Sequence, residues 1–282
     1  MKLLRFGQVG QEKPGLLDEE GNIRDLSGHI DEIDGNFLSG DQFAKVRNLD
    51  ASSLPKVEDG TRIAEPVAGV GKFICVGLNY ADHAQESGMD VPPEPVLFMK
   101  ATSAISGPYD QVELPPESKK SDWEVELGVV IGKEAKYVSE ADAMDYVAGF
   151  CLINDLSERE YQLEKAGQWV KGKSCDTFGP TGPYLVTPDE VGDFNNLNVW
   201  LELNGERVQD GSTETMVYKV PFLVHYISQF MSLQPGDIIS TGTPPGVGLG
   251  MKPPKFLQEG DVMRLGIDNL GEQRQEVIRY SK

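Results

Sequence analysis

The hydrophobic pattern of this chain predicts strands in most places and helices in few. Short apolar runs and period-two alternations are typical of strands. From residue 72 onward they lie at residues 72–76, 96–99, 123–131, 147–153, 184–186, 199–203, 238–241 and 262–267. Helical patterns lie at residues 82–87, 141–144, 157–165 and 220–230. Because strands and helices do not alternate regularly, we expect an α+β, mostly β fold with a mixed, largely antiparallel sheet system and a few outer helices.

The first 70 residues have a weaker pattern of their own. The strands expected there are short and lie at residues 2–6, 15–17 and 23–26. Residues 31–54 are polar with loose helical patches, and residues 66–71 suit a linker. We therefore expect a small N-terminal domain over residues 1–70 and a larger domain over residues 71–282.

Composition limits the partners and the compartment. The 282 residues carry a formal net charge of −19, which disfavours nucleic acid and anionic membrane surfaces as partners. The three cysteines form no CxxC pair and indicate a reducing compartment without a disulfide framework. The sequence has no signal-peptide pattern and no apolar run near transmembrane length. We therefore expect a cytoplasmic protein.

Two glutamates lie on one face of the strand expected at residues 123–131. Glu124 and Glu126 are two residues apart, so their side chains point the same way, roughly 7 Å apart along the strand. Two carboxylates at this spacing repel each other unless a cation lies between them. Mg²⁺ or Mn²⁺ suits such oxygen ligands best. The alternative is an amphipathic strand with a solvated acidic face.

A third carboxylate follows the buried strand expected at residues 147–153. Asp155 is held at a site or is the N-cap of the helix expected at residues 157–165. Three carboxylates around Mg²⁺ would leave coordination positions for water and a bidentate substrate.

A histidine and a glutamate lie three residues apart in the helix expected at residues 82–87. His83 and Glu86 would share one helix face. A carboxylate beside an imidazole raises its basicity and fixes its tautomer, as a general base for water requires. The alternative is a surface ion pair.

Two loops rich in glycine and proline could bind an anion. Residues 171–183 contain Lys173, and residues 236–248 contain Thr243. Backbone N–H groups of such loops can form an anion site. The alternative for residues 171–183 is an ordinary rigid connection.

Taken together, these segments resemble the fumarylacetoacetate hydrolase family. The resemblance covers about residues 71–282 and rests on blocks in the family's order. These blocks are GLNYADHAQE, WEVELGVVIG, ND with Arg159 and Gln162 after it, KSCDTFGPTGP and GDIISTGTPPGVG. The resemblance implies a mixed β-roll, often dimeric, with a small N-terminal domain in some members. We therefore expect a homodimer.

The resemblance also implies the metal site and the catalytic pair. Glu124, Glu126 and Asp155 would hold the divalent metal, Mg²⁺ or Mn²⁺. His83 and Glu86 would form the pair that activates water.

Further residues of the resemblance would contact the substrate. Lys173 would be the cation beside the reacting oxygens. Arg159, Gln162 and Thr243 would bind the substrate, with Thr243 on its carboxylate.

One difference from the family's pattern indicates which branch of the family this chain resembles. The animal enzyme that names the family has an additional metal aspartate seven residues before its histidine, where this chain has Val76. The chain therefore resembles the three-carboxylate branch: acylpyruvate hydrolases, oxaloacetate decarboxylases, hydroxyheptadienedioate isomerases and hydrolases of sugar-derived diketo acids. Its first residues are most similar to bacterial 2,4-diketo-3-deoxy-sugar-acid hydrolases, such as those acting on rhamnonate or fuconate products.

The expected function is metal-dependent hydrolysis of a small anionic keto acid. A 2,4-dioxo acid, either an acylpyruvate or a 2,4-diketo-3-deoxy sugar acid, would be cleaved at a C–C bond to pyruvate and a carboxylic acid. An oxaloacetate decarboxylase or a hydroxyheptadienedioate-type isomerase could use the same site. A remoter alternative is a non-catalytic protein that binds structural Ca²⁺.

Overall fold

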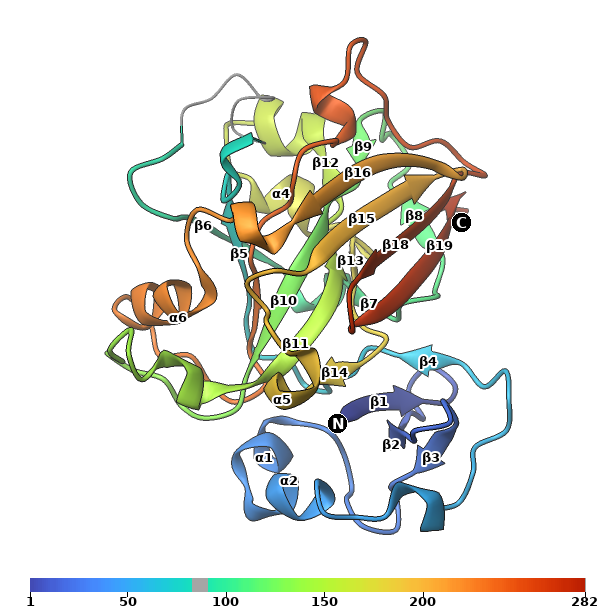
Figure 1. Cartoon of the computed structure of the whole chain (residues 1–282). Helices are drawn as coiled ribbons and strands as arrows, with labels where there is room; N and C mark the ends of the chain where they lie inside the picture. The colour runs from blue at the N-terminus through green and yellow to red at the C-terminus, as the bar shows by residue number, and fades with distance from the viewer. Residues whose placement is uncertain (83–90, 282) are drawn as a thin grey trace.

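A ten-stranded sheet runs through the whole molecule in this computed structural model, which describes residues 1–82 and 91–281 (Figure 1). Its strands lie in the order β3 (Ile23–Asp25), β2 (Lys13–Leu17), β1 (Lys2–Phe6), β14 (Leu185–Val186), β11 (Val147–Asn154), β10 (Val125–Ile131), β17 (Ile238–Ser240), β5 (Phe73–Gly77) and β6 (Val96–Lys100), with β4 (Ile63–Ala64) paired to β1. Neighbouring strands are antiparallel except β17 and β5, which are parallel. This mixed sheet confirms the expected fold class.

A second, five-stranded sheet covers one face of the first. Its strands lie in the order β16 (Glu206–Ser212), β15 (Asn198–Leu203), β18 (Val262–Ile267), β19 (Gly271–Arg279) and β8 (Val112–Leu114). Two short pairs complete the strands, β9 (Ser121–Asp122) with β12 (Ser157–Glu158) and β7 (Ile105–Ser106) with β13 (Gly179–Pro180). The second sheet curves across β10 and β11 in Figure 1.

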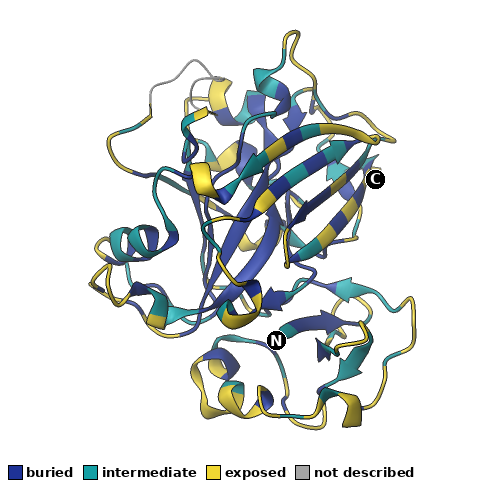
Figure 2. Cartoon of the chain, in the orientation of Figure 1, coloured by how far each residue is buried: buried dark blue, intermediate teal, exposed yellow. Residues whose placement is uncertain are grey.

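Strand β10 is buried on both faces, which explains its continuous apolar run. Every residue of β10 is buried, and β10 and β11 are dark blue in Figure 2. Val125, Leu127 and Val129 belong to the apolar core shared with the five-stranded sheet. Val130 belongs to a second core on the opposite face of the large sheet. Glu126 lies an even number of residues from Val130, so its side chain points to that opposite face.

The N-terminal strands extend the large sheet. Strand β1 pairs with β14 through Lys2 and Val186, and the second apolar core contains residues from both sides of residue 70. Helices α1 (Gly35–Ser39) and α2 (Asp41–Val46) lie beside these strands (Figure 1). The division into domains at residue 70 stays a prediction.

Within the described residues, the helices are short. Besides α1 and α2, they are α4 (Val170–Lys173), α5 (Pro188–Val191), α6 (Val220–Ser228), the π-helix η4 (Glu160–Glu164) and the 3₁₀ helices η1 (Ala51–Ser53), η2 (Thr102–Ala104), η3 (Ala143–Tyr146), η5 (Thr213–Thr215) and η6 (Gly248–Gly250). Within the described part of the chain, no helix has the length and apolar character needed to cross a membrane.

The helix expected at residues 157–165 is only partly present. Its first two residues, Ser157 and Glu158, form β12 and pair with β9, and a π-helix follows them. Pairing with a distant strand therefore overrides the local helical pattern. The helix expected at residues 141–144 is a 3₁₀ helix, and the one expected at residues 82–87 lies almost wholly outside the described residues.

Candidate active site

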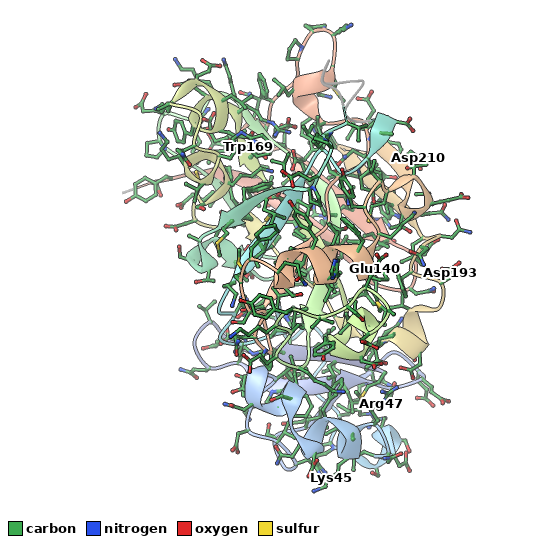
Figure 3. The ribbon with its side chains drawn as sticks, turned by 90° about the vertical axis from the view of Figure 1, so that its left-hand side faces the viewer. Lys45, Arg47, Glu140, Trp169, Asp193 and Asp210 are labelled. Atoms are coloured by element: carbon green, nitrogen blue, oxygen red, sulfur yellow. The ribbon has the colours of Figure 1, made fainter. Side chains whose placement is uncertain are left out.

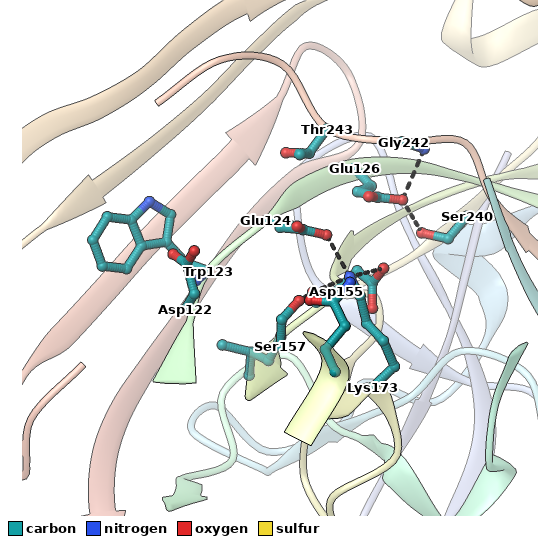
Figure 4. A network of polar contacts seen from close by, with 12 residues as sticks. Asp122, Trp123, Glu124, Glu126, Asp155, Ser157, Lys173, Ser240, Gly242 and Thr243 are labelled. Atoms are coloured by element: carbon teal, nitrogen blue, oxygen red, sulfur yellow. Dashed lines mark hydrogen bonds and ion pairs between the residues drawn. The ribbon is translucent and has the colours of Figure 1, made fainter. Parts of the chain in front are cut away.

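Three carboxylates meet at the junction of β10 and β11. Glu124 directly precedes β10, Glu126 lies within it, and Asp155 directly follows β11. The antiparallel register pairs Val125 with Asn154, so the start of one strand lies beside the end of the other. One carboxylate oxygen from each of the three lies within 4.8 Å of the others, and all three residues are buried (Figure 4). The predicted acidic set is therefore assembled, and the alternative of a solvated acidic face is wrong.

Glu126 is a buried carboxylate held by uncharged donors. Its Oε2 accepts hydrogen bonds from Ser240 Oγ at 2.5 Å and from the Gly242 N–H at 2.9 Å (Figure 4). Within the described residues, no Lys, Arg or His lies within ion-pairing distance of it. Burial, together with the charges of Asp155 and Glu124, raises the pKa of Glu126 well above its usual range. A cation at the centre of the set would relieve this repulsion, and an all-carboxylate ligand set fits a hard divalent ion.

Asp155 is held by two buried lysines. Lys173 Nζ lies 2.8 Å from its Oδ2, and Lys100 Nζ lies 2.6 Å from its Oδ1. The residues after Asp155 form β12, and the structure records no N-cap hydrogen bond from it. The alternative role of Asp155 as a helix N-cap is therefore wrong.

Lys173 joins two of the carboxylates. It is the last residue of α4, and its Nζ lies 2.6 Å from Glu124 Oε2 as well as 2.8 Å from Asp155 Oδ2. Burial alone would lower the pKa of Lys173, but the charges of Asp155 and Glu124 outweigh it and raise that pKa above its ordinary value. Lys173 therefore stays an ammonium ion at neutral pH.

Arg159 contacts the second carboxylate oxygen of Glu124. Its Nη2 donates to Glu124 Oε1 at 2.7 Å, and its Nε donates to Asp122 Oδ2 at 2.8 Å. Its Nη1 donates to Gln162 Oε1 at 3.0 Å, which fixes that amide. The predicted substrate contacts of Arg159 and Gln162 stay predictions, but the structure places both beside the carboxylates.

A pocket opens above this acidic set. Among the residues that the structure describes, its polar lining residues are Glu124, Glu126, Arg159, Gln162, Lys173 and Thr243. The other lining residues are apolar side chains and a glycine. Concave sites with a few converging polar groups and perturbed pKa values are typical of ligand-binding and active sites.

Comparison with known proteins decides the family. The family described as fumarylacetoacetate (FAA) hydrolase, C-terminal, matches residues 72–278. This chain belongs to that family. A Burkholderia ambifaria protein, provisionally named a hydrolase, is 59% identical to it over 276 residues, which cover 98% of each protein.

Solved structures of similar proteins include hydrolases and an isomerase. A fumarylacetoacetate hydrolase from Exiguobacterium antarcticum is 35% identical, with a TM-score of 0.86 over 99% of this chain and 100% of that one. Two others match all of both chains at 29% identity. One is a maleylpyruvate hydrolase from Sphingobium sp. SYK-6 in complex with manganese(II) ion and pyruvate, with a TM-score of 0.83. The other is a 2-hydroxyhepta-2,4-diene-1,7-dioate isomerase from Mycobacterium marinum, with a TM-score of 0.77. The resemblance of the first residues to sugar-acid hydrolases stays a prediction.

Thr243 lies in the loop that follows β17 in this member of the fumarylacetoacetate hydrolase family. Its hydroxyl donates to the Val125 carbonyl at 2.9 Å and accepts from Gln209 Nε2 at 2.8 Å. The loop is thereby fixed against β10, where Gly242 reaches Glu126. Contact between Thr243 and a substrate carboxylate stays a prediction.

The predicted water-activating pair lies outside the described residues. His83 and Glu86 both fall within residues 83–90, so their place relative to the carboxylates is not part of the structure described. Their role stays a prediction.

Two charged residues of the site were not predicted from the sequence. Lys100 ends strand β6 and is fully buried against Asp155. Asp122 precedes Trp123, and its carboxylate accepts the N–H groups of Gly248 and Leu249 as well as Arg159. A lysine that closes an apolar strand is a weak signal for such a role. The sequence signal for Asp122 is stronger, because Asp122 lies two residues before Glu124.

Replacing Lys100 by methionine should lower the free energy of unfolding by about 3 to 5 kcal/mol, because it leaves a buried carboxylate without one of its partners. Lys100 Nζ also donates to the Leu156 carbonyl at 2.9 Å, which would lose its donor. Urea denaturation measures the change. Lys120→Met is the matched control, because Lys120 pairs with Glu164 at the surface and should matter little. Equal, small effects of both substitutions would contradict the role given to Lys100.

Proposed function

We propose that this protein is a metal-dependent hydrolase that cleaves the C–C bond of a 2,4-dioxo acid to give pyruvate and a carboxylic acid. The observation that carries the proposal is the buried set of Glu124, Glu126 and Asp155, of which the two glutamates line a pocket together with Lys173. The similar maleylpyruvate hydrolase, solved with manganese(II) and pyruvate, supports both the metal and the product.

The three carboxylates would hold Mg²⁺ or Mn²⁺. Such an ion acts as a Lewis acid that polarises substrate oxygens and stabilises developing negative charge. The fit rests on the ligand set, which consists of carboxylate oxygens close enough to share one ion. Ser240 and Gly242 fix the orientation of Glu126, and Arg159 fixes that of Glu124.

The remaining polar groups would bind and stabilise the substrate. Lys173, held as an ammonium ion, would stabilise the oxygen of the departing pyruvate enolate. The amide N–H groups of Gln162 would orient the substrate carboxylate, and Thr243 would contact that carboxylate once its hydroxyl turns away from the Val125 carbonyl.

The proposed reaction consumes one water molecule. The His83–Glu86 pair would take a proton from water, whose oxygen then adds to the C4 carbonyl carbon. The C3–C4 bond breaks, the C4 side leaves as a carboxylic acid, and C3 takes a proton to give pyruvate.

A decarboxylase or isomerase is the second candidate. The similar isomerase from Mycobacterium marinum shows that the fold also serves that chemistry. Such a reaction needs the same metal-binding carboxylates but no attacking water. A structural Ca²⁺ site is the remotest candidate, because it would need neither a general base nor the pocket lined by Arg159, Gln162 and Lys173.

Metal-stripped protein should be inactive, and Mg²⁺ or Mn²⁺ should restore it. The assay uses EDTA-treated protein with acetopyruvate, oxaloacetate and a 2,4-diketo-3-deoxy sugar acid. We expect a dioxo acid to be cleaved to pyruvate and a carboxylic acid only when metal is added. Full turnover after exhaustive EDTA treatment would refute the metal role, and loss of CO₂ from oxaloacetate without cleavage of any dioxo acid would favour the decarboxylase.

A further inference from the structure

The pocket has a polar floor and an apolar wall. The floor consists of the six polar lining residues already named, and each of them is at most 6% exposed. The wall, within the described residues, includes Leu78, Phe98, Leu163, Trp169, Val247 and Leu249. The two parts therefore offer different chemistry to the two ends of a bound molecule.

The wall begins directly beside the reacting groups. Lys173 Nζ lies 4.9 Å from the centre of the Phe98 ring, and the Phe98 and Trp169 rings pack edge to face with centroids 5.3 Å apart. Trp169 also packs closely on Gly77, where an added Cβ would lie 2.7 Å from the indole. A group attached to the carbon under attack would thus meet an aromatic surface at once.

The wall reaches the mouth of the pocket. Leu163 is 47% exposed, so an apolar side chain stands at the surface there without covering. Figure 3 shows Trp169 near the end of the molecule opposite Lys45 and Arg47 of the N-terminal unit. An apolar group that entered along this wall would cover surface that otherwise faces water.

The polar groups of the pocket lie on its floor and not along the wall. All three nitrogens of Arg159 donate to protein oxygens, and the second N–H groups of Nη1 and Nη2 belong to this floor. The hydroxyl hydrogen of Thr243 is used by the Val125 carbonyl. Hydroxyls of a sugar chain placed against the wall would lose water without gaining partners from the described side chains there, which carries a large free-energy cost.

We propose that the acyl group of the substrate, beyond C4, is an apolar alkyl or aryl group rather than a polyhydroxylated sugar chain. This inference rests on the proposed function and names its substrate class. The dioxo acid end occupies the polar floor, and the acyl group lies along Phe98, Trp169 and Leu163.

The test is a series of acylpyruvates with acetyl, butanoyl, hexanoyl and benzoyl groups, assayed with Mg²⁺ beside a 2,4-diketo-3-deoxy sugar acid. We expect kcat/KM to rise roughly four-fold for each methylene that the wall buries. The kcat/KM of the sugar acid should be at least about ten-fold lower than that of the alkyl compound of equal chain length, because the hydroxyls of the sugar acid stay unpaired. A sugar acid that equals or exceeds that compound, or a series that does not rise with chain length, would overturn the inference.

Two variants test whether the dependence of kcat/KM on acyl chain length comes from the wall. Trp169→Ala should lower the ratio of kcat/KM for hexanoylpyruvate over acetopyruvate by about ten-fold, and Leu163→Asn by about four-fold. Leu163 is half exposed, so its substitution should not affect folding. Val170→Ala is the control, because Val170 is also exposed but does not line this pocket. An unchanged ratio in both wall variants would refute the inference, whereas failure to cleave any dioxo acid would instead refute the proposed function.

Discussion

Replacing Glu126 by glutamine is expected to abolish divalent-metal binding and to lower kcat/KM by at least about 10³-fold, because the Lewis acid is worth several kcal/mol. Glutamine has nearly the same shape, so the substitution removes charge and leaves packing intact. The variant keeps an acceptor for Ser240 and Gly242, the two groups that hold Glu126. Calorimetry with Mg²⁺ and Mn²⁺, together with steady-state kinetics, measures both effects.

Ser240→Ala is the matched control for this prediction. It removes a hydrogen bond at 2.5 Å from Glu126 Oε2 and keeps the carboxylate charge. A loss of about 10- to 100-fold in metal affinity or activity is expected, as for groups that orient a ligand. Tight Mg²⁺ binding by Glu126→Gln would show that the metal is held by other residues.

Replacing His83 by alanine should lower hydrolysis by about 10²- to 10⁴-fold, the usual contribution of a positioned general base. Affinity for Mg²⁺ should stay close to that of the wild type, because His83 is assigned to water. Decarboxylation of oxaloacetate needs no attacking water, so any such activity should survive better than hydrolysis. The measurement is the ratio of the two activities in one preparation of the variant.

His29→Ala is the control for the histidine substitution. His29 is exposed in the N-terminal unit, and its replacement should leave both activities unchanged. If hydrolysis and decarboxylation fall together in His83→Ala while metal content is intact, His83 is not a dedicated base for water. The isomerase or decarboxylase would then be the better assignment.

The carboxylate set could be predicted because its geometry follows from local rules. Residues two apart on a strand share a face, which places Glu124 and Glu126 together. A charged residue directly after a buried strand begins a loop or is held at a site, and Asp155 lies directly after the end of β11. The antiparallel register of β10 and β11 then brings this strand end to the glutamates.

The surroundings of the set could not be predicted, because they depend on contacts between distant segments. Lys100 reaches Asp155 from a strand 55 positions away in sequence. The strand pair β9–β12 replaces the first turn of an expected helix and carries Asp122 to Arg159. Local periodicity contains no information on either contact, since each is set by how the sheet folds over itself.

The proposed apolar acyl group differs from the substrate expected from the opening of the sequence. The resemblance of the first residues favours a sugar-acid hydrolase, whereas the side chains that surround the site favour an apolar acyl group. Specificity is decided by groups that touch the substrate, so the wall is the stronger guide. The residues on which it rests, such as Leu163 and Trp169, carry no recognisable motif.

The central claim is that water adds to a dioxo acid and a C–C bond breaks. Its most direct test is turnover of acetopyruvate by the Mg²⁺-loaded protein in water labelled with ¹⁸O, followed by mass spectrometry of the acetate. Hydrolysis predicts stoichiometric pyruvate and acetate, with a labelled oxygen atom from water in the acetate carboxylate. Acetopyruvate that is only enolised, or that exchanges its C3 protons without releasing acetate, would contradict the account.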